Sequence, residues 1–474
     1  MENVRMVENK IDPADRRLDR ALQHVVRPWF PINQDVLNGI RKSLSDGIYD
    51  ATPAQLLADL KNDFALFTFV VKELAAIGAT QGVPEKTLSN PVELIRWGGP
   101  KLIGEVIAAD KKLPQTHSLH WSEPFQVARL RETAVIASTA SVLSEKKDLD
   151  PDVGFSRGVM REIGLNLIAW NYPTLFSKVL NNLSAGANLD DELSKELGFT
   201  PALLAMRVLR PQAAGKTEGA GATLDANEWA EYDDLCAVGE ALARAENPET
   251  YPSAENDWAR ASKYLEGVGA AETLEKIKEQ AVNQSRRYQE ALPEVFNSLE
   301  NFNPKRNVES HTRMRAIIAD RDFRLCPPHV QEALRSLYSE MDGYSVNKAA
   351  IQTLLKSIIP QAGFTGGCVF VIDPSTSSLR PRTVIGTVSL RAITNVNLEP
   401  GDMAVTALGQ SDPLLHTKND PPPIDGIYSA LGGARKVGVL YLETPRGAQD
   451  IGEGKTIGTF NIIKQALCDV LHLK

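Results

Sequence analysis

Arg161 and Glu162 are adjacent charged residues inside an otherwise largely apolar stretch, Gly158–Ile168. Apolar residues of this stretch, among them Val159 and Ile163, recur at helical spacing, so the stretch is predicted to be a buried helix. Such a helix can present a guanidinium and a carboxylate side by side to a cleft. Three interpretations are open: a functional pair in a cleft, an ion pair or surface contact, and two solvated residues at the edge of the helix.

A hydrolytic metal centre is one chemistry that a carboxylate in a cleft can serve. Such a centre needs neutral imidazoles together with carboxylates, and one position left open for water. No histidine occurs between Trp121 and Ser310. Carboxylates alone hold Mg²⁺ or Ca²⁺ weakly, and Arg161 places a fixed positive charge beside Glu162. We therefore expect no catalytic residue, no metal ligand and no cofactor.

The competing interpretation is an enzyme, a metal-dependent phosphohydrolase or phosphodiesterase with an atypical, carboxylate-rich site. Its ligands would be Glu123, Glu162 and either Asp190 or Asp191. Metal analysis discriminates between the two interpretations, because stoichiometric iron, manganese or zinc that is lost on mutation of Glu162 would favour the enzyme.

The order of helices around the charged pair resembles the HDOD domain, a helical relative of the HD metal phosphohydrolases that is found in bacterial signalling proteins. The flanking stretches that carry the resemblance are Trp121–Ala128, Tyr172–Val179 and Glu192–Leu204. Arg161 and Glu162 stand where HD hydrolases carry a His-Asp pair, and Phe199 and Thr200 stand where a later histidine is expected. The resemblance implies a degenerate HD position that serves as a regulatory contact, since HDOD domains are non-catalytic modules that act through protein contacts.

Composition excludes several other classes of protein. The net charge is −8 and the pI is about 5.6, which argues against a nucleic-acid-binding protein with a basic face. The apolar runs are too short to span a bilayer, and Met1–Arg20 is charged and lacks the apolar core of a signal peptide. The four cysteines are widely spaced, which indicates neither a zinc site nor a disulfide framework. We expect a cytoplasmic protein without nucleic-acid or membrane partners.

The first two thirds of the chain are expected to be helical. We expect a polar N-terminal segment, 1–29, and then an HDOD-like helical domain, 30–300, with lobes at about 30–110 and 117–300. Thr52-Pro53 and Asn90-Pro91 predict helix starts, because each pairs a capping residue with a proline at the first helical position. Pro211–Ala226 is rich in Gly, Ala and Thr and is expected to be a mobile loop. A charged helical connector is expected at 301–345.

The pattern changes from helical to strand-like in the last part, 346–474. The expected elements are a helix, two strands, a short helix, two paired strands and a closing helix. They are placed at Val346–Ile359, Gly366–Asp373, Leu379–Val388, Val405–Leu408, Ile427–Leu431, Lys436–Glu443 and Ile457–Leu471. This order resembles the GAF domain and implies an α+β fold with a central antiparallel sheet.

Together these observations predict a multidomain protein with an all-α HDOD-like domain followed by an α+β GAF-like domain. The expected function is non-enzymatic signal transduction in bacteria through protein–protein contacts. The expected partners are signalling proteins, with a small ligand or a second copy of the chain at the GAF-like domain. The sequence does not identify which residues would bind that ligand.

Overall fold

The computed structural model describes residues 13–108, 113, 117–184, 187–209, 226–341, 346–388, 394–418, 423–445 and 453–473. The chain divides into two compact units, Met1–Pro304 and Lys305–Lys474. This division falls within the expected connector, 301–345. The segment expected to be a mobile loop, Pro211–Ala226, lies outside the described residues except for Ala226, at which a helix begins.

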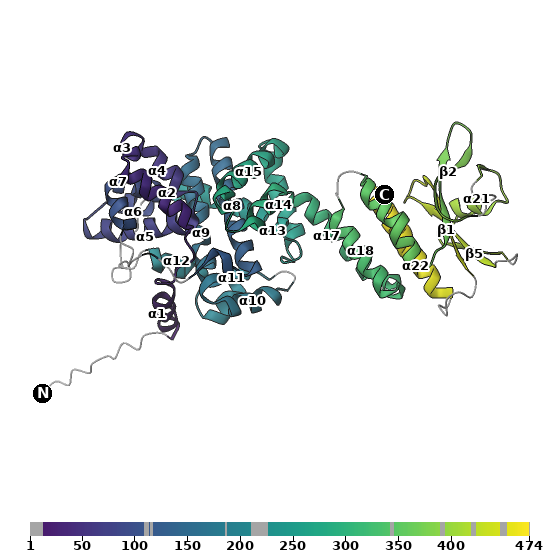
Figure 1. The fold of residues 1–474 in the computed structure, drawn as a ribbon, viewed down its shortest axis with the longest axis horizontal. Coiled ribbons are helices and arrows are strands. Elements are labelled where there is room, and N and C mark those ends of the chain that lie inside the picture. Colours follow the sequence, from purple (N-terminus) through teal and green to yellow (C-terminus); the bar gives the residue numbers. More distant parts are fainter. Residues whose placement is uncertain are drawn as a thin grey trace. The chain divides into compact units, whose positions relative to one another are not determined.

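The first unit is helical throughout its described residues (Figure 1). Its α-helices are α1 Pro13–Val25, α2 Gln34–Ser45, α3 Ile48–Ala51, α4 Pro53–Leu60, α5 Phe64–Thr80, α6 Glu85–Ser89, α7 Pro91–Ala108, α8 Pro124–Lys146, α9 Pro151–Asn171, α10 Pro173–Asn181, α11 Leu189–Leu197, α12 Pro201–Leu209, α13 Ala226–Glu246, α14 Ala254–Glu266, α15 Ala270–Ser285 and α16 Pro293–Glu300. Short 3₁₀ helices lie at Leu119–Trp121 and Arg286–Tyr288. The helix starts predicted at Pro53 and Pro91 are confirmed.

Helices α8 and α9 lie at the centre of this unit and pack closely against each other, because α9 carries glycine at the points of contact. A Cβ atom added to Gly158 would lie 2.7 Å from the Cα of Ala137, and one added to Gly164 would lie 2.0 Å from the carbonyl oxygen of Pro201. The absence of these Cβ atoms lets α9 approach both α8 and α12. The predicted burial of the Gly158–Ile168 helix is confirmed by Val159 and Ile163, which are at most 1% exposed.

The second unit combines helices with one sheet. Its elements are α17 Pro304–Ala319, the 3₁₀ helix η4 Arg321–Leu325, α18 Pro328–Glu340, α19 Lys348–Thr353, the π-helical turn η5 Leu354–Ile358, α20 Ile359–Gln361, β1 Gly366–Asp373, β2 Ser378–Gly386, β3 Val396–Asn397, α21 Met403–Leu408, β4 Leu414–Lys418, β5 Ile424–Leu431, β6 Gly438–Pro445 and α22 Glu453–Val470. The strands are antiparallel in the order β3-β2-β1-β6-β5-β4.

Helices pack on both faces of this sheet. On one face Leu440 belongs to an apolar cluster with Leu354 of η5 and Ile463 of α22. On the other face Phe370 and Tyr441 belong to a separate cluster with Ala404 and Ala407 of α21. The alternation of side chains along each strand supplies both clusters. The expected order, a helical region followed by an α+β region, is thus confirmed.

Two details of the second unit differ from the sequence-based expectation. The helix expected over Val346–Ile359 begins at Lys348 and changes to a π turn at Leu354. Strands β3 and β4, at the two edges of the sheet, were not expected. Among the described residues, no helix combines the length and apolar character that a membrane span requires.

Candidate functional site

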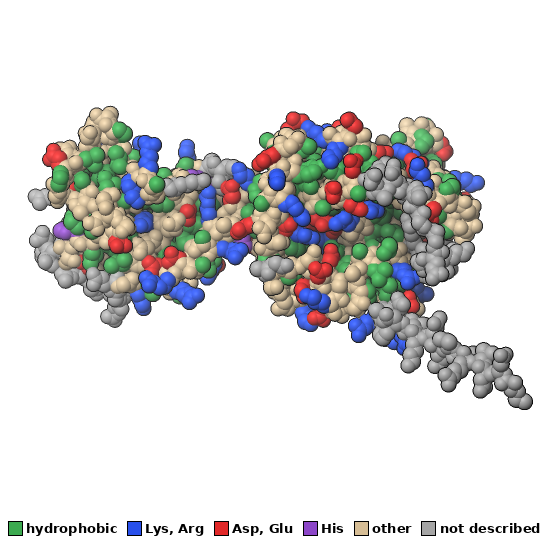
Figure 2. Space-filling view, turned by 180° about the vertical axis from the view of Figure 1, so that it is seen from behind, with side chains coloured by type: hydrophobic (Ala, Val, Ile, Leu, Met, Phe, Trp, Pro, Cys, Tyr) green, Lys and Arg blue, Asp and Glu red, His purple; other side chains and the backbone are tan. Residues whose placement is uncertain are grey.

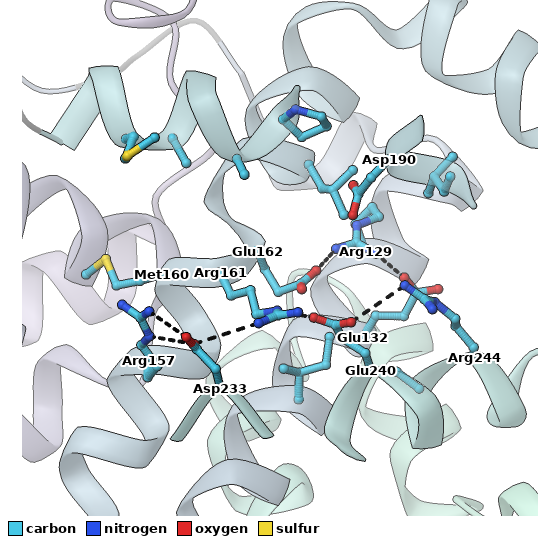
Figure 3. A pocket seen from close by; sticks show the side chains of 18 of the residues that line it. Arg129, Glu132, Arg157, Met160, Arg161, Glu162, Asp190, Asp233, Glu240 and Arg244 are labelled. Carbon is cyan, nitrogen blue, oxygen red and sulfur yellow. Dashed lines mark hydrogen bonds and ion pairs between the residues drawn. The ribbon is translucent and has the colours of Figure 1, made fainter. Parts of the chain in front are cut away.

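A cavity of about 430 Å³ lies in the helical unit, and both Arg161 and Glu162 line it. Five helices contribute to its wall, namely α8, α9, α11, α12 and α13 (Figure 3). Its charged residues are Arg129, Arg157, Arg161 and Arg244 together with Glu132, Glu162, Asp190, Asp233 and Glu240. The cavity therefore carries charges of both signs, whose pairing decides which chemistry is available.

Arg129 of α8 is the centre of the buried part of this charge network. Its guanidinium donates to Glu132, one turn along α8, and to Glu162 on α9. The side chains of Arg129 and Glu162 are only 5% and 4% exposed. The hydroxyl of Tyr251 donates to both carboxylate oxygens of Glu132, at 3.0 and 2.9 Å. One buried cation thus joins two buried carboxylates.

Burial and charge have opposite effects on this network. Burial raises the pKa of the Glu162 carboxyl, and the Arg129 guanidinium opposes that rise. Burial acts to lower the pKa of Arg129, but the carboxylates of Glu162 and Glu132 outweigh it and raise that pKa. Arg129 therefore stays positively charged, and its charge is permanent at any physiological pH.

Arg161 belongs to a second network nearer the surface. Its Nε donates to Glu240 of α13, and its Nη1 lies 3.7 Å from Asp233. Arg157, one turn earlier, forms two hydrogen bonds with the Asp233 carboxylate, at 2.9 and 3.1 Å. The Arg161 side chain is 39% exposed, so this network is partly solvated.

Of the three interpretations left open by the sequence, an ion pair between Arg161 and Glu162 is not formed, because each residue pairs with another helix. Neighbouring positions on a helix do not face each other, and here Glu162 points to α8 while Arg161 points to α13 (Figure 3). The reading of two solvated residues is also wrong for Glu162, which is 3% exposed. Both residues line one cavity, as expected of a pair at a cleft.

Only two of the four carboxylates considered for a metal site are brought to one cavity. Glu162 and Asp190 line the same cavity, whereas Asp191 is exposed on α11. Glu123 caps the start of α8, where Gln126 accepts a hydrogen bond from its backbone N–H. In the part of the chain that the structure describes, no group of three or more His, Cys, Asp or Glu side chains is arranged to hold a metal ion.

Phe199 and Thr200, expected where a metal-binding relative carries a histidine, lie just before α12. Phe199 is buried in the apolar core, and the Thr200 hydroxyl accepts a hydrogen bond from the backbone N–H of Leu203 at 3.1 Å. Both residues therefore have structural roles at the start of α12.

A second cavity, of about 850 Å³, adjoins the first. Arg129, Glu132 and Tyr251 line both cavities. The rest of the second cavity includes apolar side chains such as Phe125 and Phe176, whose rings stack 5.5 Å apart. The buried network around Arg129 therefore forms the wall between the two spaces.

Sequence reasoning missed Arg129, Glu132 and Tyr251. The spacing of Arg129 and Glu132, three residues apart in a helix of buried residues, is the one local signal that pointed to them. Their other partners, Glu162 and Tyr251, are 33 and 119 positions away from Arg129 and Glu132 respectively.

No family model, curated protein or solved structure matches this chain.

Proposed function

We propose that this chain is a non-catalytic bacterial signal-transduction protein. In this proposal the helical unit is an HDOD-like domain that acts through contacts with other signalling proteins. The second unit is a GAF-like domain that binds a small ligand or joins two copies of the chain. Arg161 and Glu162 occupy the degenerate HD position.

The observation that carries the proposal is the position of Arg129 between Glu132 and Glu162. A catalytic metal site needs ligand groups that are free to bind the ion, with one position left open for water. Here a guanidinium that is covalently part of the chain satisfies both carboxylates. A buried ion network of this kind fixes the geometry of α8 against α9 and does not require a bound cation.

The surface of the helical unit is also consistent with protein contacts. On the face drawn in Figure 2, acidic and basic side chains alternate around hydrophobic patches. Protein–protein interfaces combine an apolar centre with a polar rim, whereas a nucleic-acid interface gathers basic residues.

For the second unit, the support is the order of its elements. An antiparallel sheet that carries α21 on one face and α22 on the other supports a GAF-like fold, and β3 and β4 add two edge strands that the expected order did not include. A sensor also requires that the ligand bind two arrangements of the protein with different affinity.

A hydrolysis assay tests the non-catalytic claim. The full-length chain is incubated with bis(p-nitrophenyl) phosphate and with cyclic dinucleotides in the presence of Mg²⁺, Mn²⁺, Fe²⁺ or Zn²⁺. We expect no turnover that distinguishes the wild type from Glu162→Gln. Metal-dependent turnover that Glu162→Gln abolishes would contradict the proposal and favour the carboxylate-rich phosphohydrolase.

A thermal-shift screen of the full-length chain tests the proposed sensor. The panel contains cyclic mono- and dinucleotides, nucleotides, amino acids and common metabolites. A ligand at 100 times its dissociation constant stabilises the native state by about 2.7 kcal/mol, which shifts the melting temperature measurably. If no compound shifts the melting temperature, the remaining role proposed for the GAF-like domain is dimerisation. Analytical ultracentrifugation of the same chain measures whether it is a monomer or a dimer.

A further inference from the structure

Two buried polar atoms in the first cavity lack hydrogen-bond partners. They are Nε of Arg129 and Oδ1 of Asp190, and neither has a partner among the described residues. Both side chains line the cavity. Figure 3 shows the Asp190 carboxylate beside the Arg129 guanidinium. Burial raises the pKa of Asp190, and the charge of Arg129 opposes that rise.

Unpaired buried atoms of this kind are rare in folded proteins. Nearly all buried polar groups are hydrogen-bonded, and each exception calls for an explanation. A donor or an acceptor left unpaired away from water destabilises the folded chain, because its hydrogen bonds to water are lost and not replaced. A ligand that satisfies both atoms therefore binds with a favourable contribution from each.

We propose that the cavity binds a small carboxamide or lactam. Its carbonyl oxygen accepts from Nε–H of Arg129, and its N–H donates to the Asp190 carboxylate. An amide edge presents both an acceptor and a donor, the two hydrogen-bonding types that complement the unpaired donor of Arg129 and the unpaired acceptor of Asp190. The inference rests on the proposed non-catalytic function of this cavity and names the class of ligand that would regulate it.

Charge favours an uncharged ligand over an ionic one. Arg129 already contacts the carboxylates of Glu132 and Glu162, so a third carboxylate would be repelled by both. An ammonium group would satisfy Asp190 but would lie beside the Arg129 guanidinium and leave its Nε unpaired. A neutral amide avoids both conflicts.

One part of the remaining wall is apolar and fits an apolar body on the ligand. It includes Leu165, Leu189, Ala205, Met206 and Leu209. The side chain of Met206 on α12 is 59% exposed, an unusual position for a large apolar residue. The volume of about 430 Å³ lies in the range of small-molecule sites, roughly 300–1,000 Å³.

Methyl NMR of the full-length chain tests this inference. The chain is labelled at methionine methyl groups, because Met160 and Met206 line the cavity while Met314 and Met341 belong to the core of the other unit. Four probes of similar size are titrated: benzamide, benzoate, benzylamine and acetophenone. We expect benzamide to shift the Met160 and Met206 signals with at least ten-fold higher affinity than the other three.

Variants at two neighbouring positions provide the matched comparison. Asp190→Ala removes the acceptor and should weaken benzamide binding at least ten-fold, whereas Asp191→Ala, at an exposed position of the same helix, should leave it unchanged. If Asp190→Ala does not fold, the affinities of the four probes for the wild type are sufficient to test the inference.

Three results would overturn the inference: equal affinity for all four probes, no shift of Met160 or Met206 with benzamide, or unchanged binding by a folded Asp190→Ala variant. The failure of the proposed function gives a different signal. Release of benzoate and ammonia from benzamide would show catalysis in a cavity that still binds the amide.

Discussion

The guanidinium of Arg129 on α8 donates to the Glu162 carboxylate on α9, and both side chains are almost completely withdrawn from water. This contact joins the two central helices of the helical unit. Glu132 and Tyr251 complete the network, so one cation serves two buried carboxylates.

Removing Arg129 should destabilise the fold more than neutralising Glu162. Arg129→Met leaves two buried carboxylates without a cation, which costs about 3–5 kcal/mol. Glu162→Gln keeps an acceptor for Arg129, which still has Glu132, so its cost should be about 1–3 kcal/mol. Urea denaturation measures both. A larger loss of unfolding free energy in Glu162→Gln would mean that Arg129 is not the centre of the network.

Arg161→Met should have a small effect on stability. The Arg161 side chain is partly exposed, and its pairs with Glu240 and Asp233 lie near the surface. Partly solvated pairs contribute about 0–1 kcal/mol, so the midpoint in urea should shift little compared with Arg129→Met. A loss equal to that of Arg129→Met would show that the two networks act as one.

Gly158→Ala should destabilise the chain although alanine favours helices. The new Cβ would lie 2.7 Å from the Cα of Ala137, and overpacking of this kind costs about 1–3 kcal/mol. Gly39→Ala is the matched control, because nothing lies within 4 Å of its Cβ position in α2 and the substitution should gain about 0.5–1 kcal/mol. Thermal denaturation of both variants checks whether the two substitutions change stability in opposite directions. A Gly158→Ala variant more stable than the wild type would contradict the close packing of α8 and α9.

Asp63 should make stability depend on pH in the acidic range. This residue caps α5, and burial raises its pKa to about 6 against the hydrogen bonds it accepts. Because the folded chain holds this proton more tightly than the unfolded chain, the contribution of Asp63 to stability is largest below about pH 4 and is lost as the pH rises to about 6. The total contribution is on the order of 3 kcal/mol.

Asp63→Ser is the control for that prediction, since serine also caps helices but does not titrate in this range. The difference in unfolding free energy between wild type and Asp63→Ser is measured from pH 4 to pH 7. Wild type should lose stability relative to the variant between pH 4 and 6 and then remain level. A relative gain over that interval would contradict the raised pKa.

The helix starts were predictable because their signals are local. At Asn90-Pro91 the side chain of Asn90 accepts from the backbone N–H of Val92 at 3.0 Å, and Pro91 begins α7. The break in the helix expected over Val346–Ile359 has a cause that was also visible in the sequence. Pro360 lacks the N–H that would continue the regular pattern, and a π turn precedes it at Leu354–Ile358.

The strands were predictable only where their own pattern was strong. β1 and β6 are buried along most of their length, and their apolar runs indicate strands directly. β3 has two residues and β4 has five, and both lie at edges of the sheet. Pairing with β2 and β5 defines these edge strands, and such pairing is a tertiary contact that the local sequence does not encode.

Part of the site was predictable from local sequence, and part depends on tertiary contacts. Arg161 and Glu162 stood out because charges are unusual in an apolar helix, and the structure places both at one cavity. Their partners were not predictable, because the direction of a helical side chain depends on the neighbouring helices. Arg129 is separated from Glu162 by 33 positions, and only the packing of α8 on α9 brings the two together.

Metal content is the most direct test of the proposal that the charge network around Arg129 is not a catalytic metal site. The full-length wild type and Glu162→Gln are incubated with Fe²⁺, Mn²⁺ or Zn²⁺, separated from free ions, and analysed by elemental mass spectrometry. The account predicts substoichiometric metal that is the same in both proteins. Stoichiometric metal in the wild type that disappears in Glu162→Gln would contradict it.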